Sequence, residues 1–293
     1  MKTAELFEQK TVFSLEVFPP KPDADESVIY QTLEQLSDIQ PDFISVTYGA
    51  GGGKNGSKTI QIASDIRRRY GVESVAHLPC INLTKEQARE ILDRMQAAGI
   101  ENILALRGDR TDETAAPDDF HHASDLIAFI KEHYDFNILA ACYQEVHPES
   151  TGAVDDLKWL KYKVDCGADH LITQLFLDNG YFFDFHEKAR IAGINVPIEA
   201  GIMPVTNKRQ IERMVKLCGV ALPKKFVRVL EKYEHNETAL RDAGIAYAID
   251  QITDLIAEGV DGIHLYTMNN PYIAHRIFDA VQNLITVRTG ICA

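Results

Sequence analysis

Eight short runs of apolar, largely β-branched residues, each followed by a segment of helical periodicity, constrain the fold more than any other feature. The runs cover residues 12–17, 43–47, 74–78, 102–106, 137–142, 170–174, 197–202 and 262–266. In one intervening helix, Thr84 and Gln87 form a capping-box pattern and Gly99 marks the end. Strands that alternate with helices form parallel sheets, and eight such units are typical of a closed barrel. We therefore expect an α/β fold, a single (β/α)8 TIM barrel that spans residues 1–293.

Composition narrows the classes of partner. The formal net charge is -13 and there is no long basic run, so nucleic acid and anionic membrane surfaces are disfavoured. No stretch approaches the roughly 20 apolar residues of a membrane span, and the first residues lack the apolar segment of a signal peptide. We expect a cytoplasmic protein with no membrane partner. The 5 cysteines form no CxxC pair, which indicates reduced, mostly buried thiols rather than a zinc cluster or disulfides.

Two connections between the expected strands have unusual composition. The longest, residues 218–238, is polar, and we interpret it as an excursion from the barrel rather than a domain boundary. The other contains Gly51, Gly53 and Gly56, which match the GxGxxG pattern of dinucleotide-binding loops. The acidic residue that should end the next strand is missing, because Glu73 precedes that strand instead. We favour a mobile glycine loop over the barrel mouth rather than a phosphate cradle.

Polar side chains recur where the expected strands end. In a TIM barrel the chemistry lies on the loops at the carboxyl ends of the strands, so polar groups from separate strands converge there as in an active site. A divalent metal on His77, Asp109 and His147 is disfavoured, because these residues lack the short ligand spacing of metal sites, and we predict no metal. The polar groups at the strand ends are Glu16, His77, Arg107, Asp109, Tyr143, His147, Gln174, His264 and Tyr266.

Glu16 interrupts the apolar first strand, between Leu15 and Val17. An ionised carboxylate is costly to bury, so this position favours a neutral acid that can donate a proton. Two other readings are equally compatible with the sequence: a solvent-facing glutamate, or one paired with a lysine inside the barrel. Tyr48, Tyr143 and Tyr266 bring flat amphipathic rings to the same mouth, which suits an aromatic ligand.

Seven ordered segments resemble the bacterial methylenetetrahydrofolate reductase family. They are Ser-Leu-Glu-Val-Phe-Pro-Pro (14–20), Ser-Val-Thr-Tyr-Gly-Ala (45–50), Leu-Arg-Gly-Asp (106–109), Glu-Val-His-Pro-Glu (145–149), Ile-Thr-Gln (172–174), Gly-Ile-Met-Pro-Val (201–205) and His-Leu-Tyr-Thr-Met-Asn (264–269). The likeness covers nearly the whole chain in order. It implies a barrel with non-covalent FAD that reduces 5,10-methylenetetrahydrofolate to 5-methyltetrahydrofolate by a ping-pong mechanism, with NADH or NADPH as hydride donor.

The resemblance also implies roles for single residues. Glu16 would be the general acid, and Asp109 would lie beside both the flavin and the folate pterin. Gln174 and Gln210 would contact folate or nicotinamide, and we add Tyr266 from the strand-end pattern. The FAD site would be lined by Thr47, Tyr48, Ala50, His77, Arg107, Gly108, Asp109, Ala123, Tyr143, His147, Asp156 and Lys163.

The chain departs from the family pattern at Met214, Leu175, Gln144, Trp159 and Tyr162. These differences bear on ligand stacking, on FAD affinity and on the choice between NADH and NADPH. Two other functions stay open: a pterin-binding barrel that transfers a methyl group to a corrinoid without flavin, and a non-catalytic barrel subunit. We expect small-molecule partners, methylenetetrahydrofolate and NAD(P)H, and a homo-oligomer.

Overall fold

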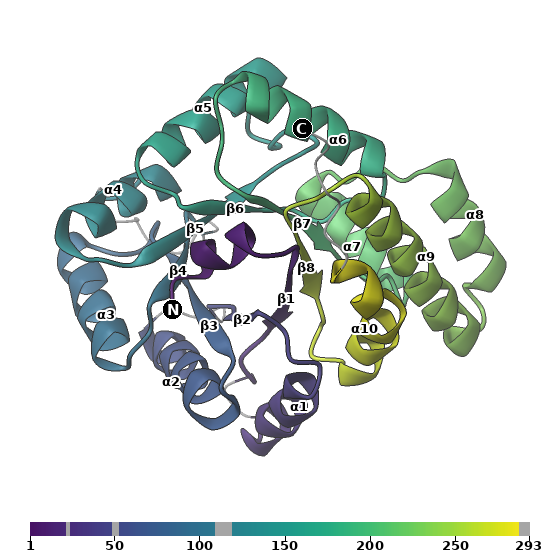
Figure 1. Ribbon diagram of the computed structural model, residues 1–293, viewed down its shortest axis with the longest axis horizontal. Coiled ribbons are helices and arrows are strands. Elements are labelled where there is room, and N and C mark those ends of the chain that lie inside the picture. The colour runs from purple at the N-terminus through teal and green to yellow at the C-terminus, as the bar shows by residue number, and fades with distance from the viewer. Residues whose placement is uncertain (22–23, 49–52, 109–118, 287–293) are drawn as a thin grey trace.

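The computed structural model describes residues 1–21, 24–48, 53–108 and 119–286 (Figure 1). Within them, parallel strands form a closed barrel in which each strand pairs with the next and β8 pairs with β1. The strands are β1 (Val12–Val17), β2 (Phe43–Val46), β3 (Glu73–Pro79), β4 (Asn102–Leu106), β5 (Asn137–Cys142), β6 (His170–Thr173), β7 (Ile198–Ile202) and β8 (Gly262–Tyr266). The predicted (β/α)8 barrel is confirmed, and the predicted strand ends differ from these by at most one residue.

Helices surround the barrel (Figure 1). They are α1 (Ser27–Ser37), α2 (Gly53–Tyr70), α3 (Lys85–Ala97), α4 (Ala123–His133), α5 (Ala153–Asp165), α6 (Asn179–Ile191), α7 (Lys208–Cys218), α8 (Lys224–Tyr233), α9 (Glu237–Ala257) and α10 (Pro271–Ile285). The capping box is confirmed: the Gln87 backbone N–H donates to Thr84 Oγ1 at 3.2 Å, and the Thr84 N–H donates to Gln87 Oε1 at 2.9 Å. No helix of the described part of the chain is long and apolar enough to cross a membrane.

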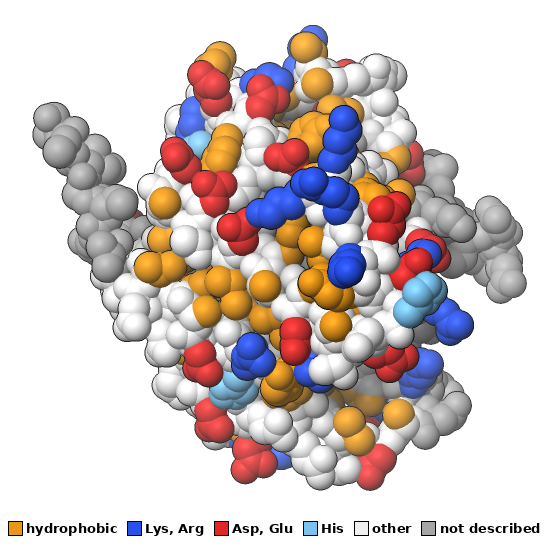
Figure 2. All heavy atoms as spheres, turned by 90° about the vertical axis from the view of Figure 1, so that its right-hand side faces the viewer, with side chains coloured by type: hydrophobic (Ala, Val, Ile, Leu, Met, Phe, Trp, Pro, Cys, Tyr) orange, Lys and Arg blue, Asp and Glu red, His pale blue; other side chains and the backbone are white. Residues whose placement is uncertain are grey.

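The connection at residues 218–238, expected to be a polar excursion, contains the helix α8. Phe226 and Leu230, four residues apart, are buried in an apolar cluster with Val205 and Leu240. The polar composition hid this helix, because two apolar residues suffice to dock a short helix whose other face stays in water. Figure 2 shows this side of the molecule, where acidic and basic side chains are interspersed with apolar ones.

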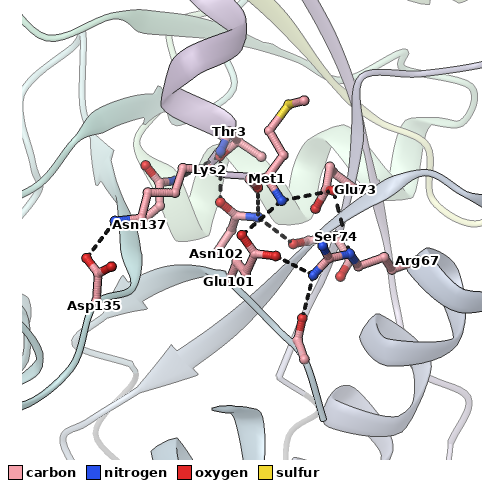
Figure 3. Close-up of polar contacts among 11 residues, drawn as sticks. Met1, Lys2, Thr3, Arg67, Glu73, Ser74, Glu101, Asn102, Asp135 and Asn137 are labelled. Atoms are coloured by element: carbon pink, nitrogen blue, oxygen red, sulfur yellow. Dashed lines mark hydrogen bonds and ion pairs between the residues drawn. The ribbon is translucent and has the colours of Figure 1, made fainter. Parts of the chain in front are cut away.

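A 3-10 helix, η1 (Thr3–Glu8), lies across the amino-terminal ends of the strands (Figure 1). The Thr3 backbone N–H donates to Asn102 Oδ1 at 2.8 Å, and Asn137 Nδ2 donates to Thr3 Oγ1 at 2.9 Å (Figure 3). The Met1 amino group lies 2.9 Å from Glu101 Oε2. These contacts hold η1 against the barrel, so this end is covered and the carboxyl ends of the strands form the open mouth.

The barrel interior contains both apolar and polar side chains. The apolar cluster contains Val12, Phe43, Val75, Leu104, Leu139 and Ile172. On the side of β1, β7 and β8, the buried side chains include Ser14, Glu199 and His264. Polar groups are costly to bury without a partner, so this side of the interior calls for an explanation beyond packing.

Candidate active site

One large cavity, of about 1070 Å³, opens over the carboxyl ends of β2 to β5 and extends between α3, α4 and α5. Every described residue that the sequence assigned to the FAD site lines it. Ala50 and Asp109 lie outside the described residues. The predicted residues in the lining are Thr47, Tyr48, His77, Arg107, Gly108, Ala123, Tyr143, His147, Asp156 and Lys163.

A basic and an acidic side chain, Lys163 and Asp156, line the α5 side of the cavity. Lys163 Nζ donates to the Ala141 carbonyl at 2.8 Å, and burial lowers the pKa of Lys163. Burial also raises the pKa of Asp156, although the His147 backbone N–H donates to its Oδ2 at 3.4 Å. Both shifts disfavour the charged forms of these two side chains. An anionic ligand beside Lys163 would favour its cationic form, because opposite charges stabilise each other more strongly where water is excluded.

His147 and Tyr143 form one aromatic contact of the wall, with ring centroids 4.6 Å apart at 73°. His147 Nδ1 accepts the Glu149 backbone N–H at 3.0 Å, and burial lowers the pKa of His147. The ring is therefore a neutral imidazole that carries its proton on Nε2. Arg107 is held in a two-pronged ion pair with Glu149, at 2.5 and 2.8 Å. A phosphate that binds Arg107 must share or displace this carboxylate.

Close backbone approach explains two glycines of the cavity wall. Gly108 has a φ of +86°, and a Cβ added there would lie 2.8 Å from the Pro79 Cβ. At Gly56 an added Cβ would lie 2.3 Å from the Tyr48 hydroxyl oxygen, so this glycine makes room for the tyrosine ring. Gly53 begins α2 and Gly56 lies inside it. The expectation of a glycine loop that extends to Gly56 is therefore wrong, while residues 49–52 lie outside the described residues.

His122 and Trp159 also line the cavity. The sequence analysis did not predict that these two residues form a pair. Their rings stack with centroids 6.0 Å apart at 22°. Trp159 is 57% exposed, although tryptophan usually buries most of its surface. The two residues come from α5 and from the residue that precedes α4. No local pattern connects them, so only the fold reveals this aromatic pair.

Glu16 lies inside the barrel next to this cavity and is 7% exposed. Its Oε2 is 3.6 Å from His77 Nε2 and 3.7 Å from His264 Nε2. Within the described part of the chain, no lysine or arginine nitrogen lies within 4.0 Å of this carboxylate. Among the residues that the structure describes, Glu16 therefore neither faces solvent nor pairs with a lysine, so both alternative interpretations are wrong. His77 also lines the cavity, so it connects Glu16 with the predicted flavin site.

One of the two histidines beside Glu16, His77, is a poor cation. Burial lowers the pKa of His77 to about 4, against the opposing effect of Glu16, so His77 is neutral near pH 7. The Thr267 hydroxyl donates to the Glu16 carbonyl at 2.6 Å, which fixes the backbone of β1 at this point. A buried carboxyl group beside a neutral imidazole, with no lysine or arginine partner among the described residues, is placed to exchange a proton with a ligand rather than to form a structural ion pair.

The predicted substrate residues lie on the other half of the mouth. The Tyr266 hydroxyl donates to the Thr173 carbonyl at 2.7 Å, and its ring lies over Gly201, where an added Cβ would be 2.8 Å from the hydroxyl oxygen. Tyr266 is the ladder partner of Glu16, which brings these two predicted residues together. Gln174 directly follows β6, and Gln210 lies in the first turn of α7. Neither these two glutamines nor Tyr266 lines the large cavity described above.

Leu175 and Met214, two of the residues that depart from the family pattern, lie in the same part of the structure. Both belong to an apolar cluster that Tyr266 also contacts. The structure therefore collects two of the unusual residues beside a predicted substrate residue. Gln144 is also buried, and its Nε2 donates to the Leu175 carbonyl at 3.1 Å. In the described part of the chain, no group of three or more His, Cys, Asp or Glu side chains is arranged to hold a metal ion.

Comparison with known proteins gives the family. The chain matches the profile described as methylenetetrahydrofolate reductase over residues 2–282. It is 37% identical over 264 residues to the 5,10-methylenetetrahydrofolate reductase of Pectobacterium carotovorum subsp. carotovorum, which is 90% of this chain and 88% of that protein. The protein of the same name from Escherichia coli (strain K12) is 36% identical over 278 residues, 95% of this chain and 92% of that one.

A solved structure supports the fold. An uncharacterized protein from Clostridium thermocellum, which binds two copies of 5-methyl-5,6,7,8-tetrahydrofolic acid, superposes with a TM-score of 0.68 and covers 97% of this chain and 99% of that chain. Its sequence identity is 14%, so the likeness concerns the fold alone. The family profile and the two relatives cover most of the sequence, and the chain therefore belongs to the methylenetetrahydrofolate reductase family.

Proposed function

We propose that this protein reduces 5,10-methylenetetrahydrofolate to 5-methyltetrahydrofolate, with FAD as bound cofactor and NADH or NADPH as hydride donor in a ping-pong cycle. One observation carries the proposal. The described residues assigned to FAD from the sequence all line a single cavity, and His77 of that lining touches the buried acid Glu16. The family assignment supports the folate substrate.

The cavity fits FAD in size and in chemistry. Its volume of about 1070 Å³ exceeds the roughly 300–1,000 Å³ of pockets for drug-sized ligands, as a dinucleotide requires. Lys163 offers an ammonium group to a pyrophosphate, and Asp156 offers acceptors to ribityl or ribose hydroxyls. Because Glu16 lies beside His77, the flavin ring belongs at that end of the cavity, and the adenosine belongs toward Trp159.

When bound, the flavin supplies the two-electron chemistry, taking a hydride from NAD(P)H and passing one to the folate methylene carbon. The residues of the chain have other tasks. Glu16 donates its proton to the bridging folate nitrogen, which opens the five-membered ring and leaves an iminium carbon ready for hydride. Tyr266 and Gln174 bind and orient the pterin from the opposite half of the mouth. Asp109, outside the described residues, keeps its proposed place beside the flavin and pterin.

The variant Glu16→Gln tests this assignment. The amide keeps the size of the carboxyl group but cannot give up a proton, so folate reduction should fall by about 10²–10⁴-fold. The yellow colour and the oxidation of NAD(P)H by a quinone acceptor should remain. Visible spectra, recorded anaerobically after NADH and then after methylenetetrahydrofolate, separate the two half-reactions. Near-normal folate reduction in Glu16→Gln would refute the role of Glu16, and wild-type protein that binds no flavin would favour methyl transfer to a corrinoid instead.

A further inference from the structure

A buried chain of polar groups connects Glu16 with a second glutamate, Glu199, deep inside the barrel. Glu199 Oε1 accepts the Ser14 hydroxyl at 2.7 Å, and the same hydroxyl oxygen lies 2.6 Å from His264 Nδ1. His264 Nε2 lies 3.7 Å from Glu16 Oε2. Glu199, Ser14 and His264 are all 0% exposed. The three elements that carry the chain, β7, β1 and β8, are neighbours in the barrel.

The fold makes room for Glu199 and then seals it. Its ladder partner is Gly262, where an added Cβ would lie 2.8 Å from the Glu199 Cγ. Below it, Phe7 of η1 packs on His170 with ring centroids 4.9 Å apart. The contacts that hold η1 in place close this end of the barrel (Figure 3). Among the described residues, hydrogen-bonded side chains run from Glu199 through Ser14 to His264, whose Nε2 lies 3.5 Å from Ser45 Oγ and 3.7 Å from Glu16 Oε2 at the mouth side.

Packing does not explain Glu199. Its Oε2 and both ring nitrogens of His170 have no hydrogen-bond partner among the described residues. His170 Nε2 lies 3.7 Å from Glu199 Oε2, but burial lowers the pKa of His170 to about 3, so it is not a cation. An apolar side chain of similar volume would avoid the desolvation cost of such a group. A costly buried carboxyl group next to an active site is characteristic of a functional role.

The surroundings of Glu199 keep it protonated. Burial raises the pKa of Glu199 well above 4.5, while the hydrogen bond from Ser14 opposes this effect. The more distant carboxylates of Asp42 and Asp261 raise it further. Asp42 pairs with Lys10 and Asp261 with Arg190, so neither basic group faces Glu199. Glu16, in turn, is faced by His77, His264 and the Tyr266 hydroxyl.

The chain has two hydrogen-bonding arrangements that differ by one proton. In the first, the Glu199 carboxyl donates to Ser14, Ser14 donates to His264 Nδ1, and the Nε2–H of His264 faces the Glu16 carboxylate. In the second, Glu16 carries the proton, His264 Nδ1–H donates to Ser14, and Ser14 donates to the Glu199 carboxylate. Three short proton shifts convert one into the other. The gap of 3.7 Å at Glu16 is longer than a hydrogen bond, so the last shift requires the Glu16 carboxyl group to move closer to His264 Nε2.

We propose that Glu199 is an internal proton store that supplies Glu16 with a proton through Ser14 and His264 before Glu16 protonates the folate. The inference rests on the proposed function, because it gives the acid of that reaction its proton source. No net proton is lost in the relay: Glu199 loses one, Glu16 gains one, and the negative charge moves to Glu199. The store refills by the reverse path once product has left and the mouth is open to water.

Glu199→Gln tests the relay, because the amide donates to Ser14 but cannot release a proton. Glu16 must then take its proton from bulk water, so the folate half-reaction should slow by about tenfold per pH unit as the pH is raised from about 7 to about 9. Wild-type protein should hold its rate over this range. Stopped-flow reoxidation of the reduced flavin by methylenetetrahydrofolate measures the rate, and flavin reduction by NADH should be the same in both proteins.

Two further variants separate a relay from a structural role. Ser14→Ala breaks the chain and should reproduce the pH dependence of Glu199→Gln. His170→Phe removes the other polar neighbour of Glu199, keeps an aromatic ring against Phe7, and should retain the wild-type pH profile. A Glu199→Gln profile that overlays wild type, or a loss equal at every pH and shared by flavin reduction, would overturn the relay.

Infrared spectroscopy tests whether Glu199 is protonated, and it does so without any catalytic turnover. The protonated Glu199 carboxyl should give a carbonyl band at neutral pH that shifts slowly in heavy water and is missing in Glu199→Gln. A wild-type spectrum without that band overturns the inference, whatever the reaction catalysed. Wild-type flavin that folate fails to reoxidise would instead count against the proposed function, so the two failures are distinguishable.

Discussion

The position of Trp159 predicts that it senses the adenine end of the cofactor. It is the only tryptophan in the sequence, it lines the cavity, and it stacks on His122 with a centroid distance of 6.0 Å. In the proposed function the flavin ring lies at the opposite end, beside His77 and the proposed proton donor Glu16, which are 3.6 Å apart. An adenine that reaches this part of the wall meets an indole that is already held by an aromatic partner.

The magnitude follows from stacking energies. A base stacked on an aromatic side chain contributes about 1–3 kcal/mol by alanine substitution. Since about 1.4 kcal/mol is a factor of ten, Trp159→Ala should weaken FAD binding by about 5- to 150-fold. FMN lacks adenosine, so its affinity should change less than about twofold, within the few tenths of a kcal/mol expected of a distant site. Tyr162→Ala is the matched control, because Tyr162 touches Trp159 edge-on with centroids 5.9 Å apart and does not line the cavity.

Titration of the flavin-free protein provides the assay. Trp159 fluorescence should be quenched by FAD and by ADP, while FMN should quench it much less. Affinities for FAD and FMN, measured for wild type, Trp159→Ala and Tyr162→Ala, then separate adenine binding from flavin binding. Equal loss of FAD and FMN affinity in Trp159→Ala, or fluorescence that ignores ADP, would refute the placement of adenosine at this end.

Two predictions concern stability. Gly108→Ala should lower the free energy of unfolding by about 1–3 kcal/mol, because φ is +86° and the new Cβ would press on Pro79; thermal unfolding measures this loss, and an unchanged transition would contradict the geometry. His170 takes up a proton near pH 6.5 when unfolded but only near pH 3 when folded, so stability is lost as the pH falls through this window. In His170→Phe the slope of unfolding free energy against pH should therefore be smaller by up to about 1.4 kcal/mol per pH unit between about pH 6 and pH 4. Denaturant titrations at several pH values measure this slope. Equal slopes in wild type and His170→Phe would contradict the prediction, because they would mean that His170 binds its proton equally well in the folded and unfolded protein.

Local sequence patterns determined the barrel and the outline of the site. Strand and helix periodicities are properties of neighbouring residues, so all the strands could be located from the sequence to within a residue. Parallel strands of a barrel end at one mouth, and this topology alone brings Glu16, His77 and Tyr266 to the same end. The helix α8 was missed because its sequence offers only two buried apolar residues, Phe226 and Leu230. These residues are buried by Val205, after β7, and by Leu240 of α9, and that contact exists only in the folded protein.

Tertiary structure decided what surrounds the acid. Barrel closure pairs Ser14 with His264, residues from opposite ends of the chain, and no local pattern predicts that contact. The sequence left open whether Glu16 faces water, a lysine or an apolar wall, and the fold placed it between two histidines, one of which burial keeps neutral. Burial and partner geometry set the chemistry of an ionisable group, and both depend on segments that only folding brings together.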